Sequence, residues 1–301
     1  MYFDSKKTLL KVLSLFSVVR IPNIFLIVLA QYLTSIFILA HQDNPYDVLT
    51  DTTLLIIVFC TVGAIASGYI ANNFYDQEKD LINRPQKLMI DHIVSQKTKF
   101  WVYITLNFSV VFLSSFISIR AVAFFLSYIF FIWFYSHKIK KLPLIGNLTS
   151  ALLSITPFFA ILLYFKNYNA LIFVFGFYLF LVLTIRELLK SLINIKGDLT
   201  LNYKTVPVLY GEFYTKKVVS ILISINCLVS FILIYFFELR KMNIFFIGSS
   251  VYLIFIFFLL RKAKDQRDFN LIQNFLKLLI FIGVLSIVLL DPSLVLNKIS
   301  F

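Results

Sequence analysis

Charged residues are scarce in this chain. Only 14% of its 301 residues are Asp, Glu, Lys or Arg, whereas 60% are hydrophobic. A soluble domain is typically about 25% charged and about 45–50% apolar. The composition therefore excludes a soluble globular protein, because the apolar excess has to be solvated by lipid.

Cysteine and glycine are also rare, with two and eight residues. Cys60 and Cys227 both lie inside apolar stretches, so packing explains them better than a disulfide does. No cleavable signal peptide is visible, because the first eleven residues are polar and basic. The first apolar run begins near Ile21 and is long enough to span a bilayer.

What the chain has instead is a series of long apolar runs. Backbone groups in lipid must be hydrogen-bonded within their own segment, so run length outweighs the strand preference of Ile and Phe. Each run is close to the roughly 20 residues that a membrane helix needs. The sequence predicts an all-α polytopic membrane bundle of about nine transmembrane helices, forming a single domain over residues 1–301. The predicted spans are 21–40, 53–75, 100–118, 120–138, 144–165, 169–190, 217–237, 243–261 and 273–290.

The net charge of +13 would indicate a nucleic-acid partner in a soluble protein. Here short basic loops and anionic headgroups explain most of it, and no nucleic acid is expected. All but five of the 28 Lys and Arg residues fall on the side of the N-terminal segment and of the loops after spans two, four, six and eight. The positive-inside rule therefore predicts a cytoplasmic N-terminus and an external C-terminus. The five exceptions are Arg120, Lys166, Arg240, Lys241 and Lys298.

The most informative stretch follows the second span. Asn72, Asp76 and Asp80 are spaced i, i+4, i+8, so they line one face of a helix. Two carboxylates and an amide oxygen make an oxygen-only site of the kind that suits Mg²⁺ bridged to phosphate. Arg84 follows and can also reach a phosphate. The alternative is an ordinary solvated helix end that leaves the headgroup region.

A second polar stretch ends the sixth span. Ser191, Asn194 and Asp198 are spaced i, i+3, i+7 and again share a face,. Two facing helix ends of this kind can hold a metal–diphosphate group. Spacing alone favours the alternative, a basic cytoplasmic loop with one acid. The basic residues around the stretch are Arg186, Lys190, Lys196 and Lys204.

Two further stretches contribute candidate residues. Tyr135 and Lys140 belong to the basic segment after the fourth span, where Lys140 can contact an anion, although a positive-inside loop is explanation enough. Asn23 enters the first span, where an unpaired polar group is costly, so we expect it to face the bundle interior. The polar ends of spans two and six lie four spans apart, which is a weak sign of internal duplication.

These stretches, in this order on nine spans, resemble the UbiA superfamily of intramembrane prenyltransferases over nearly the whole chain. The first motif of that family, Asn-Asp-x-x-Asp-x-x-x-Asp, is here Asn72-Asn73-x-x-Asp76-x-x-x-Asp80. Its second aspartate motif follows the sixth helix. The segment from Arg186 to Pro207 looks most like the branch that alkylates glycerol phosphate lipids, the (di)geranylgeranylglyceryl phosphate synthase-like enzymes.

The resemblance implies a reaction. An allylic prenyl diphosphate bound through Mg²⁺, with Mn²⁺ as the alternative, ionises to a carbocation that a membrane acceptor captures. A glycerol phosphate lipid is the favoured acceptor, and an aromatic quinone precursor and a haem-like macrocycle are the alternatives. The resemblance also implies catalytic roles for Asp76, Asp80, Asp198 and Lys140. It implies metal ligation by Asn72, Asp76, Asp80, Asn194 and Asp198, and substrate binding by Asn23, Asn72, Arg84, Tyr135, Lys190, Asn194 and Lys204.

The chain departs from the family pattern at both motifs. Asn73 replaces an Asp, which we expect to be mild because the three residues of the metal face remain. In the second motif the family has three acids, at the positions of Ser191, Asn194 and Asp198, and only Asp198 is left. Glu187 and Glu78 are candidate substitutes, although neither lies on the expected face and Glu187 is a full turn deeper.

Three functional hypotheses follow. The favoured one is an active prenyltransferase. The second is a catalytically weak or inactive membrane protein that binds prenyl diphosphates or lipids. The third is a transporter, for which polar residues in mid-span and helices broken by Gly or Pro are typical. The spans here are almost unbroken and the polar clusters lie at their ends, which favours an enzyme whose site opens to one side.

Overall fold

The structure is a computed structural model that describes residues 2–40, 44–237 and 239–291. Every regular element within these residues is helical. The predicted external C-terminus and Lys298 lie outside the described residues. The elements are α1 Tyr2–Val19, α2 Ile21–Thr34, η1 Ser35–Leu39, α3 Pro45–Thr50, α4 Thr52–Tyr75, α5 Gln77–Asn83, α6 Pro85–Asp91, α7 Gln96–Ser115, α8 Ile119–His137, η2 Ile139–Lys141, α9 Ile145–Phe165, α10 Ala170–Ile193, α11 Ile195–Thr200, α12 Val206–Phe236, η3 Arg240–Met242, α13 Asn243–Lys262, α14 Gln266–Ser286 and η4 Ile287–Leu290.

Eight helical segments are long and apolar enough to cross a membrane. Each coincides with a predicted span, which confirms a polytopic membrane bundle. The remaining predicted span, 100–118, corresponds to α7, which is 20 residues long but falls outside those eight. Gln96, Lys97 and Lys99 in its first turn and Asn107 in its middle make it less apolar than the others.

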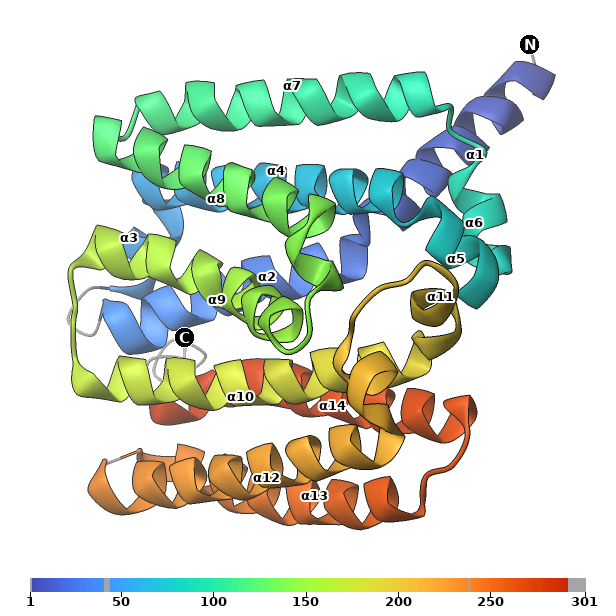
Figure 1. Ribbon diagram of the computed structural model, residues 1–301. Coiled ribbons are helices and arrows are strands. Elements are labelled where there is room, and N and C mark those ends of the chain that lie inside the picture. The colour runs from blue at the N-terminus through green and yellow to red at the C-terminus, as the bar shows by residue number, and fades with distance from the viewer. Residues whose placement is uncertain (1, 41–43, 238, 292–301) are drawn as a thin grey trace.

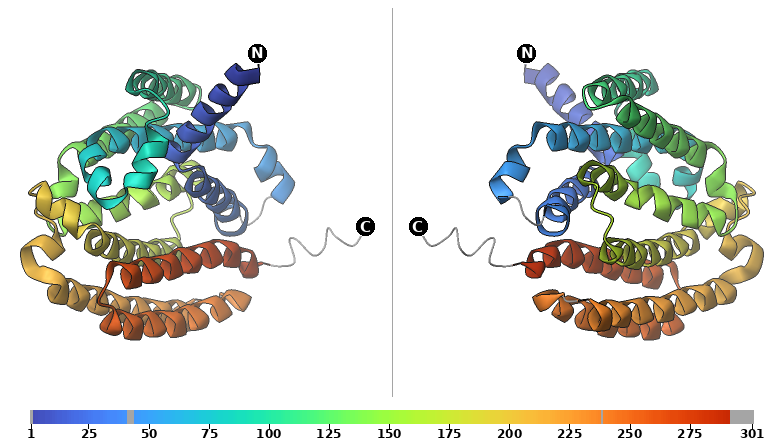
Figure 2. Two further views of the ribbon diagram at one scale, coloured as in Figure 1. Left: turned by 90° about the vertical axis from the view of Figure 1, so that its right-hand side faces the viewer. Right: turned by 90° about the vertical axis from the view of Figure 1, so that its left-hand side faces the viewer.

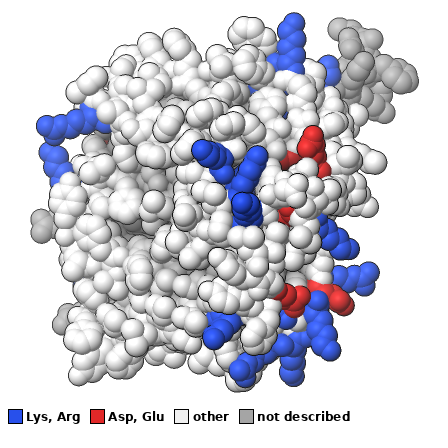
Figure 3. Space-filling view, in the orientation of Figure 1, with Lys and Arg blue, Asp and Glu red and all other residues white. Residues whose placement is uncertain are grey.

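The long helices run side by side in layers (Figures 1 and 2). α4, α7 and α8 form one layer, α2 and α9 lie in the middle, and α10 with α14 separates them from α12 and α13. The short helices α5, α6 and α11 gather at one end of the bundle, at the right of Figure 1. We call this the polar end, because most of the visible charged side chains lie toward it in Figure 3, while much of the remaining visible surface is uncharged.

Side-chain caps fix where several of the long helices begin. Asp51 Oδ1 accepts hydrogen bonds from the backbone N–H groups of Thr53 and Leu54 at the start of α4, at 2.8 and 3.3 Å. Ser95, Ser118 and Asn169 cap α7, α8 and α10 in the same way. Such caps satisfy backbone donors that have no partner within the helix.

α4 is the most buried of the candidate spans, and it carries the first polar motif at its end. Gly63 and Gly68 let α7 and α8 approach it closely. A Cβ atom at Gly63 would lie 2.6 Å from Val110, and one at Gly68 would lie 2.5 Å from Ile132. Small residues at helix contacts are what membrane helices use to pack without a hydrophobic driving force. The first motif is therefore held on a helix that is fixed on several sides.

α12 begins earlier than predicted. The sequence placed the seventh span at 217–237, whereas the helix starts at Val206 and bends at Gly211, where φ is +80° and ψ is 171°. Glycine adopts this backbone conformation without the steric cost that a side chain would add. The bend lets the first turn of α12 follow the polar end before the helix enters the bundle.

Candidate active site

A polar cavity of about 60 Å³ lies at the polar end, between the end of α4 with α5 and the end of α10 with α11. Both polar motifs contribute to its wall, so the expectation that the two helix ends face each other is met. The motif residues that line it are Asn72, Asp76, Asp80, Ser191, Asn194 and Asp198.

In the first motif, the helical hydrogen-bond pattern continues through a kink. The Asp76 N–H donates to the Asn72 carbonyl at 3.0 Å, and the Asp80 N–H donates to the Asp76 carbonyl at 2.7 Å. The i, i+4, i+8 spacing therefore keeps all three side chains on one side, although α4 ends at Tyr75 and α5 begins at Gln77.

Lys140 reaches the first motif from the segment after α8. Its Nζ lies 2.6 Å from Asp76 Oδ1 and 3.4 Å from Asn72 Oδ1. Burial alone would raise the pKa of Asp76, but Lys140, Lys79 and Lys190 outweigh it and the pKa is lowered. Burial lowers the pKa of Lys140, and Asp76 opposes that shift. The pair is therefore a buried carboxylate and a buried ammonium, each holding the other charged.

Gly146 positions the turn that carries Lys140. A Cβ atom at Gly146 would lie 3.0 Å from the Ile139 carbonyl oxygen and 3.2 Å from Lys140 Cα. A larger residue would push the start of α9 away from this turn. The glycine thus permits the close backbone approach that brings the Lys140 ammonium to Asp76.

The second motif is built around Asp198, whose side chain is almost completely buried. Lys79 of α5 forms an ion pair with Asp198 Oδ1, and Thr205 Oγ1 donates to Asp198 Oδ2 at 3.2 Å. The Lys79 ammonium also lies 5.3 Å from the ring centroid of Tyr203. Burial and the negative charges of Asp76, Asp198 and Glu78 raise the pKa of Tyr203 to about 12.

Asn83 fastens the two motifs to each other. Its Oδ1 accepts from the Gly197 N–H at 3.2 Å, and its Nδ2 donates to the Asn194 carbonyl at 3.4 Å. A Cβ atom at Gly197 would lie 2.3 Å from Asn83 Nδ2. Only glycine leaves room for this contact, which ties α5 to α11.

Ser191 lines the cavity as the spacing predicted, whereas Glu187 differs from the prediction. The Ser191 hydroxyl donates to the Glu187 carbonyl at 3.2 Å and accepts from Asn147 Nδ2 at 2.9 Å. The Glu187 carboxylate lines the cavity and pairs with Lys190 at 2.8 Å. The interpretation that Glu187 lies off the expected face was wrong, because the cavity extends one helical turn deeper than the motif.

Three other predicted residues, Arg84, Tyr135 and Lys190, line the cavity together with Arg20. Burial and the neighbouring Arg20 lower the pKa of Arg84, while Asp80, Asp76 and Glu187 oppose that shift. Four cationic or hydrogen-bonding side chains therefore face the same space as the acids.

Two predicted substrate-binding residues lie outside the cavity wall. Asn23 donates to the Tyr69 hydroxyl at 3.2 Å, so its polar group is paired beside the site. Lys204 is exposed, and its backbone N–H donates to the Lys141 carbonyl at 3.0 Å. The next residue, Thr205, lines the cavity instead, because neighbouring residues of an extended segment point in opposite directions.

Asn73 belongs to a separate buried cluster. Its Nδ2 donates to Asp91 Oδ2 at 3.0 Å, and its Oδ1 accepts from Lys99 Nζ at 2.9 Å. Lys87 Nζ also contacts Asp91 Oδ2 at 2.9 Å, and Ser17 of α1 donates to Asp91 Oδ1 at 3.1 Å. The amide in place of an acid therefore serves a network behind the motif and does not face the cavity.

The oxygen donors of the cavity are of the kind that a hard divalent cation prefers. Among the described residues, no three His, Cys, Asp or Glu side chains are close enough to hold a metal ion by themselves. The first motif supplies two carboxylates and one amide oxygen to a common space, which is the chemistry that suits Mg²⁺ with retained waters. The first motif therefore offers the better donor set for a cation, whereas the second motif offers a single carboxylate.

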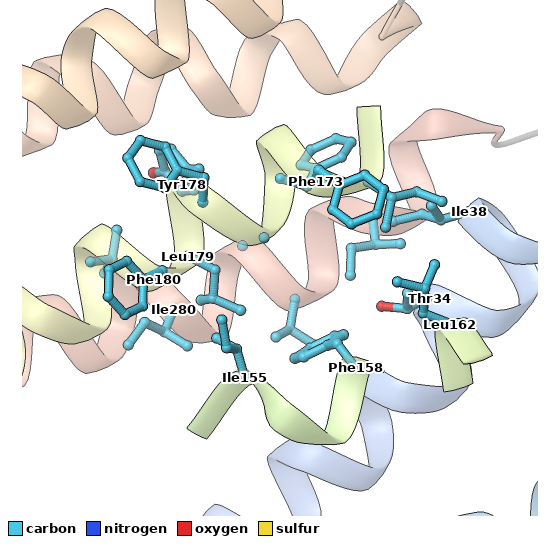
Figure 4. A pocket seen from close by; sticks show the side chains of 18 of the residues that line it. Thr34, Ile38, Ile155, Phe158, Leu162, Phe173, Tyr178, Leu179, Phe180 and Ile280 are labelled. Atoms are coloured by element: carbon cyan, nitrogen blue, oxygen red, sulfur yellow. The ribbon is translucent and has the colours of Figure 1, made fainter. Parts of the chain in front are cut away.

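An apolar cavity of about 390 Å³ lies further along the same helices. Ile155 and Phe158 of α9 and Leu179 and Phe180 of α10 project into it, and Ile280 of α14 completes this part of the wall (Figure 4). α10 leads from the polar cavity at Glu187 to the apolar cavity at Val182, a distance of about 8 Å along the helix,. A polar head and an apolar tail can therefore lie in succession along α10.

The model of the UbiA prenyltransferase family matches residues 28–289. The chain belongs to this family. The match covers all the helices that line the two cavities, apart from the first residues of α2.

Curated relatives agree with the family. The chain is 25% identical over 279 residues to the digeranylgeranylglyceryl phosphate synthase of Methanobrevibacter smithii, covering 86% of this chain and 91% of the relative. It is 31% identical over 223 residues to the enzyme of the same name from Methanosphaera stadtmanae, covering 73% and 74%.

Solved UbiA structures share the fold. A structure described as giving insights into digeranylgeranylglyceryl phosphate synthase in membranes has a TM-score of 0.68 at 21% identity, covering 92% of this chain and 97% of that one. A UbiA homologue from Archaeoglobus fulgidus, bound to GPP and Mg²⁺, has a TM-score of 0.66 at 14% identity, covering 91% and 99%. These TM-scores show that the chain shares the fold of these structures.

Sequence reasoning assigned no role to three residues of this UbiA site: Lys79, Asn147 and Thr205. Lys79 lies within the first motif, but its partner Asp198 is 119 residues away in the sequence. No local spacing signals such a pair, so only the packing of α5 against α11 reveals it.

Proposed function

We propose that this protein transfers a prenyl group from an allylic prenyl diphosphate to a glycerol phosphate lipid, with a divalent metal ion at the first motif. The observation that carries the proposal is the polar cavity itself. It brings Asp76 and Asp80 opposite Asp198, among lysines and arginines, and an apolar cavity lies further along α10.

The cations of the cavity fit a diphosphate. Lys140 and Lys79 are each paired with a carboxylate, while Arg84 forms no ion pair among the residues that the structure describes. A diphosphate entering this space meets donors that are already oriented, which strengthens electrostatic stabilisation of a leaving group as its charge grows. Lys140, being buried, gives a stronger interaction than an exposed lysine would.

Asn72, Asp76 and Asp80 would hold the metal ion, with Mg²⁺ as the expected ion. Bound there, the ion supplies Lewis-acid stabilisation of the departing phosphate oxygens. Asp198 and Asn194 are the residues available to a second ion, although a single carboxylate makes that side weaker. A relative of the same fold, the Archaeoglobus fulgidus homologue, binds Mg²⁺ together with a prenyl diphosphate.

The proposed reaction is an alkyl transfer. The bond between C1 of the prenyl group and the diphosphate oxygen breaks, and the diphosphate leaves with the electron pair. The acceptor hydroxyl oxygen then forms a C–O ether bond to C1, and its proton passes to the released diphosphate. Exclusion of water by the bundle protects the allylic cation from hydrolysis.

The apolar cavity is proposed to hold the prenyl tail. Its wall is formed almost entirely by aliphatic and aromatic side chains, including Phe158, Phe173 and Phe180. Burying apolar surface stabilises binding by about 25 cal/mol per Å². A tail that fills the space therefore adds substantially to the affinity of the diphosphate head.

The names of the relatives support the acceptor. A digeranylgeranylglyceryl phosphate synthase is named for a product with two geranylgeranyl groups on glycerol phosphate. Removing one prenyl group from that product leaves geranylgeranylglyceryl phosphate as the acceptor. We also propose that the polar end faces the cytoplasm, because the basic loops lie there, and that the chain acts as one domain.

The test is product analysis by mass spectrometry. Purified protein in nanodiscs receives geranylgeranyl diphosphate and Mg²⁺ with geranylgeranylglyceryl phosphate, or with an aromatic quinone precursor. The proposal expects a diether phosphate product from the first mixture only. An aromatic product would show that the acceptor is the aromatic compound and not the lipid. No product from either mixture, despite diphosphate binding, would favour a binding protein with little turnover.

A further inference from the structure

Two cationic side chains lie inside the spans and have no part in the site described so far. Arg186 belongs to α10 and Lys277 to α14, both of which are candidate membrane spans. Charged residues within a span are costly, and most of them serve a function. Neither forms an ion pair among the residues that the structure describes.

Arg186 carries an unsatisfied donor. Its Nε is buried and has no hydrogen-bond partner among the described residues. Lys277 is exposed, and its Nζ donates to Asn274 Oδ1 at 3.0 Å. A buried guanidinium donor without an acceptor costs free energy unless a ligand satisfies it.

The two side chains approach each other along the bundle axis. Gln266 Nε2 donates to the Ile193 carbonyl at 2.7 Å, which sets the start of α14 level with the end of α10. From this level Arg186 is about 10 Å and Lys277 about 16 Å into the bundle. Because side chains tilt toward the N-terminus of their own helix and the helices are antiparallel, Arg186 leans deeper and Lys277 leans back toward the polar end. The charged groups therefore converge at similar depth.

The pair lies close to cationic residues of the polar cavity, although neither side chain is part of the cavity wall. Lys277 lies within electrostatic reach of Arg186, Arg84 and Arg20, and Arg84 and Arg20 line the cavity. The nearby Glu187 carboxylate is paired with Lys190 at 2.8 Å, and Asp76 is paired with Lys140 at 2.6 Å. Four cations thus share a region in which two of the acids, Asp76 and Glu187, are already paired.

We propose that Arg186 and Lys277, together with Arg20 and Arg84, form a second anion subsite that binds the phosphate monoester of the acceptor lipid. This inference rests on the proposed function, because it assigns a place to the acceptor beside the diphosphate. A phosphate monoester offers three acceptor oxygens and a charge near −2, which suits a fork of guanidinium donors and an ammonium.

The position of the pair suits a lipid in particular. Lys277 is exposed on a candidate membrane span, while Arg84 lines the polar cavity. A phosphate bound between them places the glycerol hydroxyl toward the diphosphate and leaves the acceptor chain among the lipids. A free phosphate ion has the same charge but lacks that chain.

The first experiment measures binding without turnover. Wild type, Arg186→Gln and Lys277→Gln in nanodiscs are compared for binding geranylgeranylglyceryl phosphate and its neutral counterpart, geranylgeranylglycerol. Wild type should bind the phosphate form at least tenfold more tightly, and each variant should lose about tenfold, which corresponds to one charge-assisted contact. Lys277→Arg should restore most of the affinity. Lys262→Gln, an exposed lysine at the end of α13, is the matched control and should bind like wild type.

The second experiment measures turnover. Arg186→Gln and Lys277→Gln should raise the KM for the acceptor about tenfold while the KM for geranylgeranyl diphosphate stays within twofold. Soluble glycerol phosphate, added as a competitor, should inhibit only weakly if a lipid phosphate is the ligand. Strong inhibition by the soluble compound would overturn the lipid assignment.

The outcomes separate the two proposals. If wild type makes product but neither variant changes acceptor binding or KM, the subsite is wrong and the proposed function stands. If both KM values rise together, the two cations bind the diphosphate, and the subsite is again wrong. If wild type makes no product, the proposed function fails, and selective loss of phosphate-lipid binding in the variants would still support the subsite.

Discussion

The two acidic helix ends of the polar cavity have nearly the same backbone and different charge. α4 passes into α5 through Asp76 at φ −101° and ψ 6°, and α10 passes into α11 through Asn194 at φ −96° and ψ 11°. In each, an Asp follows four residues after the kink, at Asp80 and at Asp198. Asp76 and Asn194 therefore occupy equivalent places, and one of them is neutral.

This difference indicates a division of labour. The first end holds two carboxylates, and Lys140 reaches Asp76 from the segment after α8. The second end holds one carboxylate, and Lys79 of α5 already neutralises it. Two helix ends with nearly the same backbone can thus differ in role. The first end can bind a metal ion, and the second end holds the first in place. Four variants test this comparison.

The largest effect is expected from Asp76→Asn, which makes the first end as neutral as the second. Without this carboxylate the metal loses a charged ligand and Lys140 loses its buried partner, so kcat should fall by at least about 100-fold, close to 3 kcal/mol in transition-state free energy. Product formation in nanodiscs is the measurement. Glu78→Gln removes an exposed acid from the same motif, outside the cavity wall, and should retain activity. Equal losses in the two variants would argue against a specific metal ligand.

Asn73→Asp restores the residue that the family has at this position and should destabilise the first end. Asn73 donates to Asp91, whose side chain is fully buried, and a carboxylate there cannot donate. We expect a loss of about 1–3 kcal/mol in unfolding free energy, seen as a lower thermal midpoint in detergent. Asp91→Asn combined with Asn73→Asp exchanges the two groups and should recover part of that loss. No change in the single variant would mean that the cluster is not formed.

Gly197→Ala breaks the fastening at the second end. The added methyl would lie 2.3 Å from Asn83 Nδ2, so Asn83 must turn away and release its two contacts to α11. The expected loss is about 1–2 kcal/mol in unfolding free energy. Because α5 carries Asp80, we also expect weaker metal binding, seen as a higher Mg²⁺ concentration for half-maximal rate. Gly248→Ala is the control, since a Cβ atom there meets no atom within 4 Å. Equal stability of the two variants would refute the fastening role.

The smallest effect is expected from Ser191→Asp with Asn194→Asp, which erases the difference between the two ends. Added carboxylates should lower the Mg²⁺ concentration that gives half-maximal rate by severalfold, because charged ligands bind Mg²⁺ more tightly than neutral oxygens do. The measurement is a Mg²⁺ titration of the rate. An unchanged half-maximal concentration would show that these side chains do not reach a metal.

Much of this arrangement follows from the sequence. Run length alone locates the spans, because lipid leaves the backbone no alternative to helices. The i, i+4, i+8 spacing placed Asn72, Asp76 and Asp80 on one side of the cavity, since helical hydrogen bonds continue through the kink at Asp76. Run length is a weaker guide at α7, because its Lys and Asn residues reduce the apolar signal of the predicted span 100–118. Its packing on α4 nevertheless keeps it in the bundle.

The contacts between distant segments were beyond prediction. Lys79 with Asp198, and Asn83 with Gly197, join parts of the chain more than a hundred residues apart. Glu187 was misplaced because the depth of a cavity depends on which helices surround it. Lys277 gave no motif signal, and its significance appears only when α14 is seen against α10.

The most direct test of the central claim is diphosphate release by the protein in nanodiscs supplied with geranylgeranyl diphosphate. The account predicts release that requires both Mg²⁺ and geranylgeranylglyceryl phosphate, stops with EDTA, and resumes when Mg²⁺ is restored. Release that is indifferent to EDTA, or that is absent with every acceptor while the diphosphate binds, would contradict a metal-dependent prenyltransferase.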